Sequence, residues 1–249
     1  MHRLLVDQAT LAVSAPILPK EAQHHLKVLR PKDGEAVELF DGAGHTRAYR
    51  WQAARASLGA PEAMRTFPPI APALTLFACV TKGSRWDWTI EKAVELGVTR
   101  IVPVISERAI VRLASNERVA KAERWRRIAE DAARQSDAVW LPEIVPAVDF
   151  ADSLPLVKAM DAVFVGALTA PPPPPLLTAI EGALDKNQQP PGAAPSALGL
   201  YVGPEGDFSP AELKSLLEIA VPTSFGPTIL RAETAAIYGL SVLAAVCRR

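Results

Sequence analysis

From residue 74 onward the chain alternates short apolar runs with longer amphipathic segments, and this alternation limits the fold more than any other feature. Apolar runs of strand length occur at 74–80, 101–105, 161–168 and 198–202. Helical spacing of apolar residues follows each run, at 86–97, 116–135, 176–184 and 209–220. A short strand is expected around Thr223–Phe225 and a last helix from about Arg231 to Cys247. Such a chain folds as an α/β domain with a mostly parallel sheet that helices cover on both faces.

The first seventy residues have a different pattern, which is typical of β-structure. Segments 35–40 and 45–53 alternate polar and apolar residues on either side of the turn sequence DGAG. Three prolines within 67–72 indicate a linker. We therefore predict a small β-barrel or sandwich at 1–70 and the α/β domain at 73–249. A polar, proline-rich surface loop is expected at 186–196.

Composition narrows the class of protein. No apolar run reaches the length of a membrane span and the first residues lack a secretory core, so we expect a cytoplasmic protein without a membrane partner. Cys79 and Cys247 lack metal-ligand spacing and are expected to be small buried hydrophobes, so no metal site is expected. The net charge of zero hides an asymmetry: residues 80–135 hold twelve Lys/Arg and eight Asp/Glu, whereas 136–249 hold six and twelve. This favours a surface that faces a polyanion, with solvated helix faces as the alternative.

Three loops follow strands of the predicted sheet, after Leu168, after Val202 and after Phe225. Ligands of parallel α/β sheets bind beyond such strand ends. The middle loop, GPEGDFSPAEL (203–213), contains two glycines that allow the backbone to approach a ligand, and Ser209 with Glu212 has capping-box spacing. It matches neither the dinucleotide fingerprint nor the P-loop, because no Lys-Ser/Thr follows. Alone, it fits either a ligand loop or a structural turn.

The third loop places a cation where the last helix begins. Arg231 opposes the helix dipole there, whereas Glu233 favours it. A residue that conflicts with its local electrostatics indicates a functional role. The alternative is a surface ion pair between Arg231 and Glu233, which contributes little energy.

Together and in this order, GPEGDFS (203–209) and GPTILRAETA (226–235) resemble the RsmE family of the SPOUT superfamily. Segments 24–44 and 81–109 are similar to that family's N-terminal PUA-like barrel and to its first strand–helix–strand unit, so the resemblance covers nearly the whole chain. It implies an S-adenosylmethionine-dependent methyltransferase that modifies N3 of one uridine in 16S rRNA. It also implies a deep trefoil knot in the SPOUT domain and a homodimer with helix faces such as Ala235–Val246 packed across the partner.

The resemblance further implies that the knot loops bind S-adenosyl-L-methionine mainly through their backbone. The residues expected to do so are Leu168, Gly203, Pro204, Glu205, Gly206, Phe225, Gly226, Pro227, Ile229 and Leu230. Arg231 is expected to stabilise negative charge on the uracil as N3 loses its proton. Glu233 is expected to orient Arg231 or cap the helix, or else to act as the base. Because N3 lies on the Watson–Crick edge, the target has to be unpaired and flipped out.

RNA is the expected partner, either as 16S rRNA or as the assembled 30S subunit. Its phosphates are expected to meet His24, Lys27, Arg30 and Lys32 on the N-terminal module, and Lys82 and Arg85 after the first α/β strand. For His24 and His25 the alternative is packing at a strand or turn end.

The chain departs from the family pattern at three places. Thr228 stands where an arginine is usual, Asp207 where a glycine is usual, and Asp137–Ala138 where Gly-Arg is usual. Two cations are therefore missing near the expected active face, whereas the cofactor loops are intact.

Three alternatives stay open at this stage. The acceptor could be a ribose 2′-hydroxyl or another base of rRNA or tRNA. The chain could be a non-catalytic RNA-binding assembly factor, which failure to bind S-adenosylmethionine would favour. A nucleotide-dependent enzyme that uses the 203–209 loop for phosphates is least favoured, because neither a lysine nor a cluster of metal-ligating carboxylates accompanies the loop.

Overall fold

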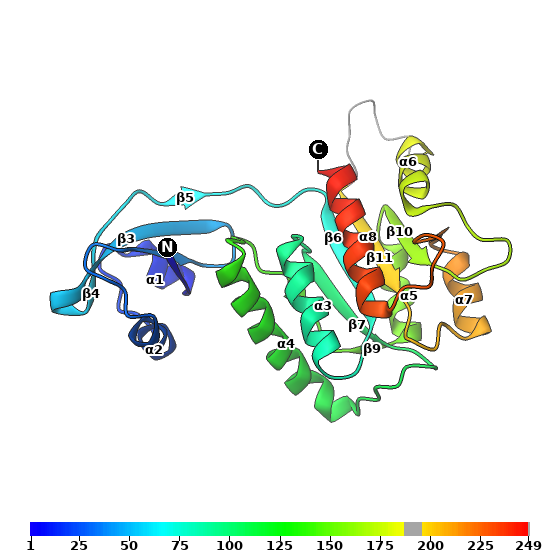
Figure 1. Ribbon diagram of the computed structural model, residues 1–249, viewed down its shortest axis with the longest axis horizontal. Coiled ribbons are helices and arrows are strands. Elements are labelled where there is room, and N and C mark those ends of the chain that lie inside the picture. Colours follow the sequence, from blue (N-terminus) through cyan, green and yellow to red (C-terminus); the bar gives the residue numbers. More distant parts are fainter. Residues whose placement is uncertain (187–195, 249) are drawn as a thin grey trace. The chain divides into compact units, whose positions relative to one another are not determined.

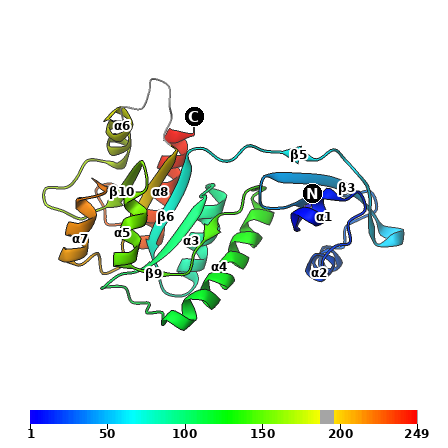
Figure 2. The ribbon, with the colours of Figure 1, turned by 180° about the vertical axis from the view of Figure 1, so that it is seen from behind.

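The computed structural model describes residues 1–186 and 196–248, and the chain divides into two compact units (Figures 1 and 2). The first consists of Met1–Pro69 and Glu130–Leu141, and the second of Ile70–Ala129 and Pro142–Arg249. Nothing in the periodicity of the long helix had indicated that its last residues belong with the first unit. The loop predicted at 186–196 lies almost entirely outside the described residues.

The first unit contains a five-stranded sheet in the order β1-β2-β3-β4, with β5 also paired to β3. The β1–β2 pair is parallel and the other pairs are antiparallel. The strands predicted at 35–40 and 45–53 are β2 and β3, so the polar–apolar alternation located them correctly. The elements of this unit are β1 (His2–Leu5), α1 (Gln8–Ala12), α2 (Lys20–Leu29), β2 (Ala36–Phe40), β3 (His45–Gln52), a 3₁₀ turn (Ala53–Arg55), β4 (Ser57–Pro61) and β5 (Arg65–Thr66).

Helix α2 was missed by the sequence analysis, and His24 and His25 lie on it rather than at a strand or turn end. Its ends lack the usual signals. Pro19 provides no side-chain cap, and the helix ends at Arg30 in the left-handed conformation (φ 48°), where a glycine is more common. Only two of its residues, Ala22 and Leu26, are buried apolar side chains, although their i, i+4 spacing is helical.

The second unit is an α/β domain with a seven-stranded sheet. Its order is β12-β10-β11-β6-β7-β8, β9 also pairs with β7, and every pair is parallel. Its strands are β6 (Ala73–Cys79), β7 (Arg100–Ile105), β8 (Glu143–Ile144), β9 (Val148–Asp149), β10 (Ala162–Gly166), β11 (Ala197–Val202) and β12 (Val221–Thr223). Its helices are α3 (Ser84–Glu95), α4 (Ser115–Gln135, of which the last turns belong to the first unit), α5 (Phe150–Lys158), α6 (Leu176–Lys186), α7 (Pro210–Leu217) and α8 (Ala232–Cys247).

The predicted strand–helix alternation is confirmed, with two refinements. The strand expected around Thr223–Phe225 ends at Thr223, and α5 with the short strands β8 and β9 had not been predicted. Gly97 adopts a positive φ of 74° after α3, a conformation that glycine commonly supplies at a helix end. The deep trefoil knot stays a prediction.

Helices cover both faces of this sheet, because successive strand residues point to opposite sides (Figures 1 and 2). On one side Phe77 and Tyr201 stack with ring centroids 5.4 Å apart, in a cluster that includes Val157 of α5 and Leu216 of α7. On the other side α8 lies so close to β11 that a Cβ at Gly239 would come 2.5 Å from Leu200 Cδ2. Cys79 belongs to the buried cluster, and burial raises the pKa of its thiol to about 12, whereas Cys247 is only half-buried.

The apolar side of α8 packs within its own chain, against α3, α6, β6 and β11. Ala235, Ala236, Leu240 and Leu243 are buried there. The opposite side of the helix is less covered, and the Tyr238 side chain there is 41% exposed. Packing of a face of Ala235–Val246 across a partner, and with it the homodimer, stays a prediction.

Part of the cationic stretch 80–135 is neutralised within the chain. Arg100 pairs with Glu143, Arg118 with Asp149 and Arg124 with Asp87. The first two pairs join this stretch to acidic residues of 136–249, so ion pairs between distant segments offset part of the charge asymmetry along the sequence. Within residues 1–186 and 196–248, no helix is long and apolar enough to cross a membrane.

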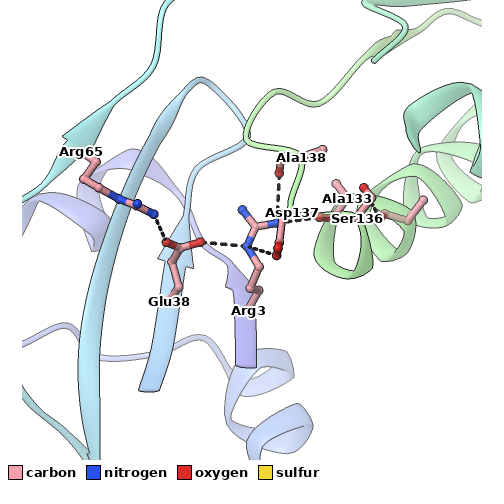
Figure 3. Close-up of polar contacts among 8 residues, drawn as sticks. Arg3, Glu38, Arg65, Ala133, Ser136, Asp137 and Ala138 are labelled. Carbon is pink, nitrogen blue, oxygen red and sulfur yellow. Dashed lines mark hydrogen bonds and ion pairs between the residues drawn. The ribbon is translucent and has the colours of Figure 1, made fainter. Parts of the chain in front are cut away.

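A buried arginine attaches the end of α4 to the sheet of the first unit (Figure 3). Arg3 Nε donates to Glu38 Oε2 over 2.9 Å, and Arg3 Nη1 donates to the carbonyl oxygens of Ala133 (2.7 Å) and Ala138 (3.2 Å). The last carbonyls of a helix lack intrahelical partners, and Arg3 supplies one. Arg65 Nη2 donates to Glu38 Oε1 over 2.6 Å from the exposed side.

Replacing each of the two arginines that share Glu38 should show how much a buried and an exposed ion pair contribute to the free energy of unfolding. We expect Arg3→Ala to lower the free energy of unfolding by about 3 kcal/mol, because it removes the buried partner of Glu38 and leaves Glu38 Oε2 and two carbonyls without their donor. Arg65→Ala removes a partner whose side chain is 62% exposed and should cost about 1 kcal/mol or less. Urea denaturation of the full chain measures both. Equal losses for the two variants would contradict this account.

Candidate functional site

A pocket of about 270 Å³ lies at the carboxyl ends of β10, β11 and β12 in the second unit. Its walls come from the three loops that the sequence analysis singled out, because parallel strands bring their carboxyl ends to one edge of the sheet. Of the ten residues predicted to bind a cofactor, eight line this pocket: Leu168, Gly203, Pro204, Glu205, Phe225, Gly226, Ile229 and Leu230. Gly206 and Pro227 belong to the same loops but are not part of the lining.

The loop 203–208 is held rigidly by a buried carboxylate. Ser209 N donates to Glu212 Oε2 (2.9 Å) and Glu212 N donates to Ser209 Oγ (3.4 Å), which confirms the predicted capping box. The second carboxylate oxygen of Glu212 accepts from the backbone N–H of Glu107 (2.8 Å), in the connection after β7. Arg108, in the same connection, donates to the carbonyls of Gly206 and Phe208. The loop is therefore fixed from two directions.

Two glycines at the pocket are required by close packing. A Cβ at Gly203 would lie 3.0 Å from the Phe208 ring, and a Cβ at Gly166 would lie 2.4 Å from Phe225 Cε2. Gly166 ends β10 and lines the pocket, and Phe225 forms an adjacent wall. Sequence reasoning had not selected Gly166, although a small residue at the end of an apolar strand was a visible signal.

Arg231 and Glu233 do not form the surface pair that was considered. Arg231 is the N-cap of α8, is exposed and lines the pocket; in the described part of the chain its guanidinium makes no ion pair. Glu233 is buried and is not among the lining residues. Its Oε1 lies 3.7 Å from Arg85 Nε, and its Oε2 has no hydrogen-bond partner within the described residues.

Arg85 joins two segments at the pocket. Besides Glu233, its guanidinium lies 3.7 Å, Nη1 to Oε1, from Glu205 of the 203–208 loop. It is half-exposed and had been predicted to contact RNA. The structure places it between two carboxylates that belong to the edge of the pocket and to the first turn of α8.

The other residues predicted to contact RNA fall in separate places. Lys82 is exposed in the connection between β6 and α3, and Lys32 is exposed after α2. In the first unit, Lys27 and Arg30 line one cavity, whereas His24 is exposed on α2 and does not line it. No group of three or more His, Cys, Asp or Glu side chains that could hold a metal ion occurs among residues 1–186 and 196–248.

Two of the departures from the family pattern have a backbone consequence. Asp207 and Asp137 both adopt a positive φ, 59° and 57°, at positions where a glycine is usual. Aspartate tolerates this region better than most residues. Asp207 Oδ1 also accepts from Phe208 N (2.8 Å), which offsets part of the cost.

The fold and the pocket define a two-unit α/β protein with a ligand site at the edge of a parallel sheet, and comparison with known proteins specifies the class. Residues 69–244 match the family model of an RNA methyltransferase domain, and residues 18–54 match that of an RNA methyltransferase PUA domain. Ribosomal RNA small subunit methyltransferase E of Mycobacterium tuberculosis is 32% identical over 235 residues, which cover 92% of this chain and 85% of the relative. The Synechocystis protein of the same name is 28% identical, covering 98% of this chain and 78% of the relative.

Solved structures agree with these matches. Ribosomal RNA small subunit methyltransferase E of Neisseria gonorrhoeae, bound to S-adenosyl methionine, superposes with a TM-score of 0.77 at 26% identity and covers 99% of this chain and 98% of its own. A Legionella pneumophila structure in complex with the cofactor gives a TM-score of 0.78 at 25% identity, covering 98% and 96%. The chain belongs to the RNA methyltransferase family that includes Ribosomal RNA small subunit methyltransferase E.

The strained Asp207 gives a test of how the pocket loop is held. We expect Asp207→Gly to raise the free energy of unfolding by up to about 1 kcal/mol, because glycine adopts a φ of 59° without steric cost. Asp207→Ala should lower it, since alanine keeps the strain and loses the bond to Phe208 N. Thermal denaturation compares the variants. A destabilised Asp207→Gly would mean that the side-chain hydrogen bond outweighs the strain.

Proposed function

We propose that this chain transfers the methyl group of S-adenosyl-L-methionine to N3 of a uridine in 16S rRNA. The observation that carries the proposal is the pocket at the carboxyl ends of β10, β11 and β12, in a chain of this methyltransferase family. Arg231, on the pocket's edge, has no ion-pair partner among the described residues. The relatives named above and the cofactor-bound structures support the same chemistry.

The pocket fits the cofactor in shape and charge. Leu168 and Ile229 are 61% and 80% exposed, so their apolar side chains are available to an adenine ring. Glu205 and Asp207 contribute carboxylates to the lining, which suits a ligand that carries a sulfonium charge. Gly203 and Gly166 keep the walls free of side chains that would fill the space. When bound, the cofactor supplies an electrophilic methyl group for in-line displacement.

Arg231 is the proposed catalytic residue. Uracil N3–H must lose its proton at or before methyl transfer, and the resulting charge spreads over O2 and O4. A guanidinium without a carboxylate partner can donate to those oxygens. Within residues 1–186 and 196–248, Arg231 is such a group at the edge of the pocket. Glu233 is the lower-ranked candidate for the base. Its pairing with Arg85 instead favours a positioning role, because Arg85 also pairs with Glu205 and so links the first turn of α8 to the pocket loop.

Three finer statements belong to the proposal. The C-terminal segment is expected to be knotted, the enzyme to act as a homodimer, and the substrate to be 16S rRNA either free or in the 30S subunit. Light scattering of the purified protein tests the dimer. Labelled-methyl transfer to naked 16S rRNA and to 30S particles tests the substrate.

A methyl group added at Gly166 should weaken cofactor binding. The new Cβ of Gly166→Ala would lie 2.4 Å from the Phe225 ring and push it into the pocket. We expect the Kd for S-adenosyl-L-methionine, measured by calorimetry, to rise about tenfold. Gly182→Ala in α6 is the matched control, because its Cβ meets nothing within 4 Å and should leave the Kd unchanged. Unchanged binding by Gly166→Ala would place the cofactor elsewhere.

Removal of the arginine at the pocket edge should stop the reaction without releasing the cofactor. We expect Arg231→Ala to lower kcat by about 10²–10³, because one charge-stabilising donor is lost, while the Kd for the cofactor changes little. Arg127→Ala, on the exposed side of α4, is the control. Nucleoside mass spectrometry of the product identifies the methylated atom. Near-normal turnover by Arg231→Ala excludes the role, and a methylated ribose would favour the 2′-hydroxyl alternative.

A further inference from the structure

A second cavity, of about 750 Å³, lies in the first unit between the end of α2 and the hairpin of β3 and β4. Its floor is apolar and includes Leu18, Leu26 and Leu58 with one aromatic ring, Trp51. Three cations belong to its walls: Lys27, Arg30 and Arg55. Among the described residues that line it there is no carboxylate.

The three cations are available to a ligand. Each is exposed, and none forms an ion pair in the part of the chain that the structure describes. This contrasts with the second unit, where most arginines of 80–135 meet acidic or carbonyl partners. The unpaired cations suit a polyanionic ligand, and the apolar floor suits a flat apolar group on that same ligand.

Trp51 is fixed as a platform. Its backbone N–H donates to Glu35 O (2.9 Å) and its carbonyl accepts from Gly34 N (2.8 Å). It faces Leu58 across the β3–β4 pair, and it packs against the buried cluster of the first unit while remaining partly exposed. An indole that is held by this packing and is partly exposed loses little entropy when a planar group stacks on it.

The backbone on both sides of the cavity is strained. Arg30 and Ala56 have φ values of 48° and 47°, each as the residue that ends a helical turn. Glycine would adopt this conformation without cost, yet the chain has an arginine whose cation reaches the cavity. At Arg30 this conformation favours a binding role for the side chain, whereas the methyl group of Ala56 offers no such contact.

We propose that this cavity binds one unpaired nucleotide of a single-stranded RNA segment, with the base stacked on Trp51 and the flanking phosphates on Arg30, Arg55 and Lys27. The site is additional to the methyl-acceptor pocket, and it rests on the proposed function only in the choice of RNA as ligand. A duplex cannot offer a free base face, so the cavity discriminates single-stranded from paired RNA.

Salt dependence separates the stacking contact from the phosphate contacts. The probe is a labelled single-stranded oligouridylate of roughly 12 nucleotides, titrated with the full chain at several salt concentrations. Arg30→Gly and Arg55→Ala should each weaken binding and reduce the slope of log Kd against log salt by about 0.7–1. Trp51→Leu should weaken binding about tenfold with an unchanged slope, whereas Trp51→Phe should keep most of the affinity.

Matched variants distinguish ligand contacts from effects on folding. Arg30→Gly relieves the strained backbone, so its thermal midpoint should rise while its RNA affinity falls; a purely structural role predicts a rise with unchanged affinity. The thermal midpoint of Ala56→Gly should rise in the same way, while the slope of log Kd against log salt stays unchanged. Arg50→Ala, next to Trp51 on β3 but outside the cavity, should leave Kd and slope unchanged.

Equal affinity for duplex and single strand together with no effect of Trp51→Leu would reduce the cavity to a non-specific polyanion surface. Competition by polyglutamate as effective as that by RNA would assign the cavity to an acidic protein partner. The assay measures RNA binding without methyl transfer, so its result would stand even if the wild-type chain lacked the proposed activity. Conversely, a loss of RNA binding at this cavity would not by itself exclude methyl transfer.

Discussion

The pocket depends most on the buried carboxylate of Glu212, because one side chain serves two segments of the chain. One oxygen closes the capping box at Ser209, and the other accepts the backbone N–H of Glu107 after β7. Without this carboxylate, two backbone donors would lose partners in a largely buried environment, which is costly. The 203–208 loop is thereby held before any ligand arrives, and a site that binds through its backbone requires such preorganisation.

The distribution of arginines at the pocket follows from electrostatics. Arg85 lies between Glu205 and Glu233, and so it links the loop after β11 with the first turn of α8. Arg231 is left without a carboxylate partner in the described part of the chain, at a helix N-terminus where its charge is unfavourable. The two guanidinium groups thus differ in role: one stabilises the geometry of the site, and the other is free to meet negative charge that develops during the reaction.

Non-glycine residues in the left-handed conformation recur where the chain makes specialised contacts. Asp207 is in the pocket loop, Asp137 follows α4 and lies beside Arg3, and Arg30 ends α2 at the second cavity. At each of these positions a glycine would have been the simpler choice for the backbone. The sequence patterns for turns and helix ends therefore fail at the positions where a side chain has a further use. At these positions the backbone favours glycine, whereas the contact requires another side chain.

Much of the second unit could be predicted, because its signals are local. Apolar runs such as 74–80 and 101–105 became the central strands β6 and β7, and the rule that loops at strand ends meet at one edge brought Leu168, Gly203 and Phe225 into one pocket. Helix α2 could not be predicted, because its caps are absent and few of its residues are buried.

Local signals in the sequence account for the main strand–helix alternation from residue 74 onward, for the positions of the pocket loops and for the capping box at Ser209, because these depend on periodicity and on residues close in the chain. They do not account for the pairing of Glu233 with Arg85 instead of Arg231, the packing of α8 against α3, or the cavity that Arg30, Arg55 and Trp51 line. The physical reason is that these contacts join residues far apart in the chain. Their partners are selected by packing and charge in three dimensions, which hydrophobic period and local propensity do not encode.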